Sequence, residues 1–169
     1  MRGDKTMSIV YTEITLKNSI DIENVESGLI PNHEIRQITV KAVVDTGAWT
    51  LVINEATRQK LGLRINKTSS GTLADGKSTE YSMAGPVKIF WQDRDTNCDA
   101  IVLPEADDIL LGAIPLEAMD LMVHPKKEEV VGVHGDEMVH KIYGFTAKNR
   151  FPVTPFCHVT AADSCPACV

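Results

Sequence analysis

One short stretch of the sequence carries residue types that could do hydrolytic chemistry. Asp45, Thr46, Gly47 and Ala48 follow an apolar run that ends at Val44. A carboxylate at the end of a rigid strand is held in position, and a glycine two residues later lets the backbone turn tightly and another chain approach closely. The hydroxyl of Thr46 can tie such a loop down. Together these residues predict a positioned carboxylate on a tight loop.

A carboxylate can hydrolyse a peptide bond without a metal when a second carboxylate lies close by. Two carboxylates a few ångströms apart cannot both ionise, so they share one proton, and the pair can activate a water on one side while protonating the amide oxygen on the other. The sequence contains one Asp-Thr-Gly and no repeat of the segment around it. The second carboxylate must therefore come from another copy of the chain, as in a two-fold dimer that places residue 45 opposite residue 45.

The elements around Asp45 can be read from the hydrophobic pattern. Alternation of apolar and polar residues over 8–17 and 36–44 predicts two strands, the second of which leads into Asp45. Residues 18–33 carry turn formers and acidic residues, which indicates an irregular connection or a short hairpin arm. After the loop, Asn54 is expected to cap a helix over 55–61 that Gly62 ends.

The second half of the chain predicts further strands and one more short helix. Two extended runs between residues 68 and 91 flank a pair typical of tight turns, Asp75-Gly76, which predicts a long hairpin with its tip at 74–77. Strands are expected over 98–103 and 109–111, and apolar residues at 114, 118 and 121 indicate a helix. Residues 130–133 and 138–143 could be strands, and the last twenty or so residues resemble a tail.

In their order along the chain, these pieces resemble the retropepsin-like (clan AA) aspartic proteases, including the small bacterial single-domain members. Residues 45–48 match the catalytic motif, the turn at 74–76 falls where the family has its flap, and Leu110-Leu111-Gly112 matches the signal before the family's short helix, here residues 113–121. The resemblance covers roughly residues 9–125. It implies an all-β fold, a closed β-barrel with one or two short helices, working as a homodimer that hydrolyses peptide bonds without a cofactor.

The resemblance also implies a role for each site residue. The catalytic residues would be Asp45, which activates the water, and Thr46 and Gly47, which frame the pair, the Thr46 hydroxyl bonding across the dimer. The substrate, a protein or peptide, would be bound by Ala48 and by the flap residues Ala74, Asp75 and Gly76. Trp49 stands where the viral members carry a small acidic residue that helps to pair the subunits, a departure that bears on the dimer contact.

Composition argues against several other classes of protein. A formal net charge of −6 with no basic stripe indicates no nucleic-acid partner. The N-terminus has no signal-like apolar segment and no run is long enough to span a bilayer, so we expect no membrane association and a cytoplasmic protein. We expect a protease domain over residues 1–125 and a C-terminal extension over 126–169, part of which could lie in the dimer interface and whose end should be flexible.

Two alternatives stay open. A fold does not guarantee an activity, so Asp45 could instead cap a turn in a catalytically silent dimerisation or peptide-binding module. Cys165 and Cys168, with Cys157 and His158 nearby, could make four zinc ligands. Their spacing fits no standard zinc knuckle, and one Cys-x-x-Cys is half a site, so we predict no metal.

Overall fold

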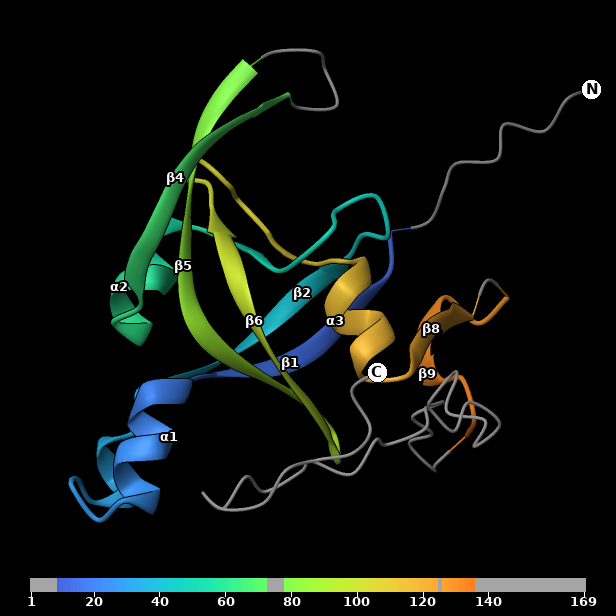
Figure 1. The fold of residues 1–169 in the computed structure, drawn as a ribbon. Helices are drawn as coiled ribbons and strands as arrows, with labels where there is room; N and C mark the ends of the chain where they lie inside the picture. Colours follow the sequence, from blue (N-terminus) through green and yellow to red (C-terminus); the bar gives the residue numbers. More distant parts are fainter. Residues whose placement is uncertain (1–8, 73–77, 125, 136–169) are drawn as a thin grey trace, which may run out of the picture. The chain divides into compact units, whose positions relative to one another are not determined.

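Strands are the main regular elements of the residues that the structure describes (Figure 1). The computed structural model describes residues 9–72, 78–124 and 126–135. The strands in this part of the chain are β1 (Tyr11–Asn18), β2 (Gln37–Val44), β3 (Val52–Ile53), β4 (Arg64–Thr72), β5 (Ser78–Trp91), β6 (Arg94–Val102), β7 (Ile109–Leu111), β8 (Leu121–His124) and β9 (Glu129–Gly132). The helices there are α1 (Ser19–Glu26), α2 (Glu55–Leu61), α3 (Ala113–Ala118) and the 3-10 turn η1 (Asn32–Glu34).

Six of these strands close into a barrel. The strand order in the large sheet is β1-β2-β7-β3-β6-β5-β4, and β1 also pairs with β5. The second pairing joins residues 15–18 of β1 to residues 87–90 of β5, so the sheet returns on itself and β4 extends it beyond the ring. Closure removes the exposed strand edges that an open sheet would present. The closed all-β barrel expected from the sequence is confirmed.

The barrel interior is filled by alternate residues of its strands. On β1, Ile14 and Leu16 are fully buried while their neighbours are more exposed, which is the period-two pattern of a strand with one face in the core. Leu51, Ile53 and Leu111 join the same cluster. Leu51 directly precedes β3, Ile53 lies on β3 and Leu111 lies on β7, so the core supports the segments next to the Asp45 loop.

The position of β7 decides where Asp45 lies. β7 runs between β2 and β3, parallel to β2 and antiparallel to β3. The connection from β2 to β3, which contains Asp45, must therefore cross the end of β7. For this reason, the residues that follow β7, beginning with Gly112, lie next to the connection that contains Asp45.

Helix α2 matches its prediction. Asn54 is the N-cap, and its side-chain oxygen accepts a hydrogen bond of 2.9 Å from the backbone N–H of Thr57. Gly62 ends the helix at φ +59°, in the left-handed region that glycine adopts without strain.

The segment 18–33 differs from its prediction as an irregular connection or hairpin arm, because it contains helix α1. Asn18 caps this helix, its side-chain oxygen accepting from the backbone N–H groups of Ile20 (2.9 Å) and Asp21 (3.3 Å). The helix has only eight residues and almost no apolar face, so its periodicity is too weak to be recognised. Its one sequence signal is an Asn followed by an acidic residue in the first turn.

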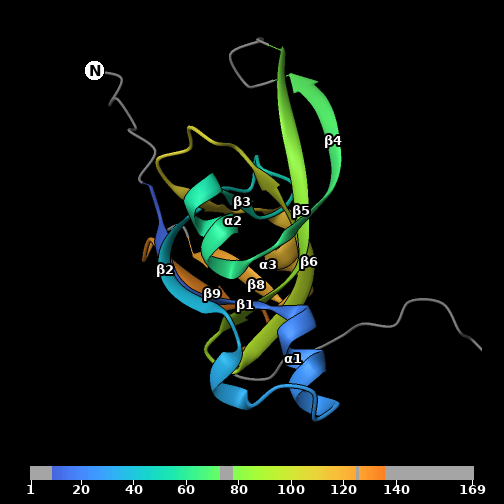
Figure 2. The same ribbon diagram turned by 90° about the vertical axis from the view of Figure 1, so that its left-hand side faces the viewer.

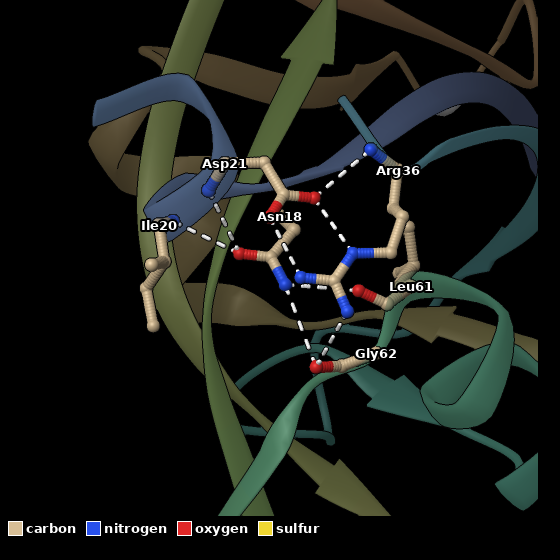
Figure 3. A network of polar contacts seen from close by, with 6 residues as sticks. All are labelled: Asn18, Ile20, Asp21, Arg36, Leu61 and Gly62. Atoms are coloured by element: carbon tan, nitrogen blue, oxygen red, sulfur yellow. Dashed lines mark hydrogen bonds and ion pairs between the residues drawn. The ribbon is translucent and has the colours of Figure 1, made fainter. Parts of the chain in front are cut away.

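Three side chains connect α1 to the C-terminal end of α2, and we call Asn18, Asp21 and Arg36 the α1 clamp (Figure 3). The Arg36 guanidinium donates to both oxygens of Asp21, at 2.6 and 2.7 Å, and to the carbonyl of Gly62 at 3.4 Å. The Asn18 amide donates to the carbonyl of Leu61 at 2.9 Å. The hydrogen bonds from Arg36 hold the pKa of the almost fully buried Asp21 below its usual value.

The chain beyond α3 packs against the same core. The helix predicted to continue to residue 121 ends earlier, since Asp120 has φ +55° and β8 begins at Leu121. β8 pairs with β9, and Val130 on β9 is a member of the core cluster. The buried guanidinium of Arg94 donates to the carbonyls of residues 119, 120 and 135. Residues 136–169, including the predicted strand at 138–143 and the tail, lie outside the described residues, and the division at residue 125 stays a prediction.

Candidate active site

Asp45 is the first residue after β2 and is held in place by backbone hydrogen bonds. Its N–H donates to the carbonyl of Leu111 at 3.1 Å, which extends the β2–β7 pairing by one residue. Its own carbonyl accepts from Ala48 N–H at 3.1 Å, and its carboxylate Oδ1 accepts from Gly47 N–H at 2.8 Å. The second carboxylate oxygen, Oδ2, has no hydrogen-bond partner among the described residues. One oxygen of this partly exposed side chain is thus fixed, and the other is available.

The far side of the Asp45 loop is anchored on α3. Ala113 N–H donates to the Ala48 carbonyl at 2.8 Å, and Ile114 N–H donates to the Trp49 carbonyl at 2.9 Å. Gly112 permits this contact, because a Cβ atom there would lie 2.7 Å from both the Ala48 carbonyl oxygen and the Thr50 nitrogen, closer than real Cβ atoms approach. The predicted Leu-Leu-Gly signal therefore lies directly beside the loop.

The predicted site residues divide into two groups. Asp45, Thr46, Gly47 and Ala48 form one turn. Thr46 is exposed, and its hydroxyl makes no hydrogen bond within the part of the chain that the structure describes. The predicted hairpin is confirmed as β4 and β5, paired from residues 64 and 85 up to residues 72 and 78. Its tip, with Ala74, Asp75 and Gly76, lies outside the described residues.

Sequence reasoning did not identify an apolar surface next to Asp45. Directly paired residues of neighbouring strands point to the same face of a sheet, and Asp45 follows Val43 by two positions, so both lie on one face. The neighbours of these residues on each strand pack into the core, so this face is the one turned away from it. The row of paired apolar residues on this face, which we call the apolar row, comprises Val43, Leu110, Val52, Ile101 and Met83.

The row was missed because its members are adjacent only through strand pairing. They come from five different strands, and their order in space is not their order in the sequence. Val52 and Ile101 are buried, whereas Val43, Leu110 and Met83 are partly exposed. The row therefore presents an apolar floor beside a carboxylate.

No group of three or more His, Cys, Asp or Glu side chains gathers as metal ligands would among the residues that the structure describes. The four residues weighed in the sequence analysis as zinc ligands, Cys157, His158, Cys165 and Cys168, lie outside that part of the chain. No described helix is both long and apolar enough to cross a membrane.

One protein family matches part of this chain. Residues 32–113, which run from before β2 to the start of α3, match the model of the aspartyl protease family. No curated protein matches the sequence.

Several solved structures resemble the chain at low identity. They include a retropepsin-like aspartic protease from Rickettsia conorii (19% identity, 69% of this chain and 88% of that one, TM-score 0.39). The retroviral protease-like domain of Ddi1 from Leishmania major is 18% identical over 70% of this chain and 83% of that one, with a TM-score of 0.43. EIAV protease complexed with the inhibitor HBY-793 is 16% identical over 69% of this chain and 91% of that one, with a TM-score of 0.43.

The family match includes the Asp-Thr-Gly loop, the hairpin strands and the Leu-Leu-Gly segment within one continuous stretch. The closed barrel, with β7 passing between β2 and β3, supplies the architecture in which these segments meet. Residues 32–113, just under half of the chain, are therefore similar to the aspartyl protease family, a family of peptidases.

Proposed function

We propose that the protein is a homodimeric aspartic endopeptidase whose site is formed by two copies of Asp45. The observation behind this proposal is that the chain supplies one of the two carboxylates that the reaction needs, which we call the half-site. Asp45 is rigidly held and partly exposed, its Oδ2 atom has no partner among the described residues, and the sequence contains no second Asp-Thr-Gly. A two-fold axis beside Asp45 would supply the missing carboxylate without a second motif in the chain.

The chemistry follows from the pair sharing one proton. The ionised carboxylate takes a proton from a water held between the two groups, and the water oxygen attacks the carbonyl carbon of the peptide. The protonated carboxyl donates its proton to the carbonyl oxygen, which gives a neutral tetrahedral diol. Collapse of this diol returns a proton to the pair, protonates the leaving nitrogen and breaks the C–N bond.

The remaining site residues support this pair. The exposed Thr46 hydroxyl, which has no partner within the described residues, would bond to the loop of the second copy. Gly47 keeps the space over Asp45 open, because a Cβ atom there would lie 3.1 Å from Oδ1. Ala48 and the hairpin tip at Ala74, Asp75 and Gly76 would contact the substrate, the tip by closing over it.

The apolar row supports a preference for substrates with apolar side chains next to the cleaved bond. Leu110 and Val43 lie nearest to Asp45 on its own face of the sheet, so they would contact the residues beside the reacting carbonyl. Fully burying an apolar side chain of the peptide against such a surface contributes about 1.5–3 kcal/mol to the free energy of binding. This contribution favours peptides with apolar side chains at these positions and orients them.

The test compares wild-type protein with Asp45→Asn on a diverse peptide library across acidic to neutral pH, with cleavage products identified by mass spectrometry. Asparagine keeps the size of the side chain but cannot carry the shared proton, so we expect loss of cleavage with an unchanged thermal unfolding curve. Asp93→Asn, at an exposed carboxylate in the β5–β6 turn, is the matched control and should cleave like wild type. Absence of cleavage in a folded, dimeric wild type would instead favour the silent peptide-binding module.

A further inference from the structure

Three exposed apolar residues lie near the half-site along the backbone: Trp49 (50% exposed), Ile114 (48%) and Tyr11 (42%). We propose that these residues, which we call the apolar rim, form the subunit contact around the paired Asp45 residues, so that a second copy of the chain is held there by apolar burial and not by ion pairs. The inference rests on the proposed function, because it takes its occupant from the need for a second carboxylate.

Distance along the backbone places the rim inside any interface centred on Asp45. Asp45 and Ala48 are the ends of a hydrogen-bonded turn, whose Cα atoms are less than about 7 Å apart, so the Cα of Trp49 lies within about 11 Å of that of Asp45. Tyr11 pairs with Val43, two residues before Asp45, which places it within about 12 Å. A patch of about 800 Å² per partner, the usual size, has a radius of about 16 Å.

Trp49 and Ile114 are joined by a backbone hydrogen bond and lie next to each other. The backbone bond from Ile114 N–H to the Trp49 carbonyl joins the loop to the start of α3. Because the axis must pass close to Asp45, both side chains would be enclosed when two copies meet. Exposed Trp and Tyr residues are also the types that contribute most to binding at protein interfaces.

The chemistry of the rim is apolar and not ionic. None of its three members carries a charge. The ammonium of Lys41 lies 4.5 Å from the centre of the Tyr11 ring. Each copy of the chain carries a formal net charge of −6, so two copies repel each other at long range. Association must therefore come from buried apolar area, and added salt should not weaken it.

The first experiment measures the dimer dissociation constant by sedimentation velocity for wild type, Trp49→Ala, Ile114→Ala and Trp49→Phe. We expect Trp49→Ala to raise the constant by at least about 30-fold, as for an interface hot spot, and Trp49→Phe to raise it much less. Leu29→Ala is the matched control, because Leu29 is 73% exposed and follows α1 closely in the sequence. Helix α1 lies away from the end of β2 (Figures 1 and 2). Leu29→Ala should leave the constant unchanged.

Two further measurements separate a dimer contact from a local effect on the site. Peptide cleavage by Trp49→Ala should recover as enzyme concentration is raised, because the intact loop needs only its partner. Raising salt from about 0.1 M to about 1 M shortens the Debye length from about 10 Å to about 3 Å, and the wild-type dimer should persist or tighten. Unfolding curves of each variant at low concentration check that the monomer is folded.

The possible outcomes are distinguishable. A wild-type dimer whose dissociation constant is unchanged in Trp49→Ala and Ile114→Ala, or one that dissociates in high salt, overturns the inference and leaves the proposed function standing. A wild type that stays monomeric and inactive at high concentration overturns both. Cleavage by a monomer would refute the two-copy site itself. A different protein bound to the rim, with no self-association, also contradicts the inference.

Discussion

Replacing Gly112 by alanine tests whether the Asp45 loop is positioned by its contact with the segment after β7. Gly112 has φ −85°, a conformation that alanine adopts freely, so the change introduces no backbone strain of its own. Its added methyl group would lie 2.7 Å from the Ala48 carbonyl oxygen and the Thr50 nitrogen, and closer still to the Thr50 carbonyl oxygen. All three atoms are backbone, so no side chain can rotate away to make room.

The size of the effect follows from these distances. Real Cβ atoms essentially never come within 3.0 Å of another heavy atom, so the loop must move by several tenths of an ångström on at least two sides. Overpacking of this kind costs about 1–3 kcal/mol of unfolding free energy, or roughly 2–9 °C in melting temperature for a domain of this size. A displacement near 1 Å at a reacting group lowers the rate by about 100-fold, and both subunits carry the change.

The assay is kcat and KM for a cleaved peptide, together with thermal unfolding, for wild type, Gly112→Ala and Gly28→Ala. Gly28 is the control because it lies at φ +71° with no atom within 4 Å of an added Cβ. Alanine there should cost about 1 kcal/mol through backbone strain alone and leave kcat unchanged. The reasoning about loop position would be refuted if Gly112→Ala kept full kcat, or if both variants lost activity equally.

Two further predictions concern groups outside the loop. Arg36→Ala should lower the unfolding free energy by about 2 kcal/mol at pH 7, because it leaves the buried Asp21 carboxylate without its charged donors. The pKa of Asp21 is lowered in the folded protein, so the stabilisation by the ion pair is complete above the unfolded-state pKa near 4 and disappears as pH falls through the lower folded-state pKa. Chemical denaturation of wild type and Arg36→Ala between pH 2 and 7 measures this pH dependence. A difference in unfolding free energy that grew towards acid pH would contradict the prediction. Burial raises the pKa of the Cys98 thiol to about 11, so at pH 8 only roughly one such thiol in a thousand is ionised. Peptide mapping after pulsed alkylation should therefore find Cys98 labelled orders of magnitude more slowly in native than in denatured protein, and fast native labelling would show that the site opens.

Local signals in the sequence predict much of the fold. Period-two alternation identifies β1 and β2, Asn54 and Gly62 bound α2, and the turn pair at 75–76 identifies the β4–β5 hairpin, because each signal depends on a few neighbouring residues. Helix α1 was missed for the same reason: eight residues with almost no apolar face carry too little periodic signal. The helix after Gly112 was predicted too long, since Asp120 adopts a positive φ that no nearby residue type announces.

The order of residues is enough to show one Asp-Thr-Gly after an apolar run, with no second copy of it in this sequence. Those two facts suffice to predict a carboxylate that needs a partner. The neighbours of that carboxylate can be identified only in the folded chain. The apolar row joins five strands, and the α1 clamp joins residues 18 and 62. Strand pairing brings residue 11 beside residue 43, and a backbone hydrogen bond joins residue 114 to residue 49. Such contacts are set by strand order and barrel closure, which depend on pairings between distant segments that no local pattern records.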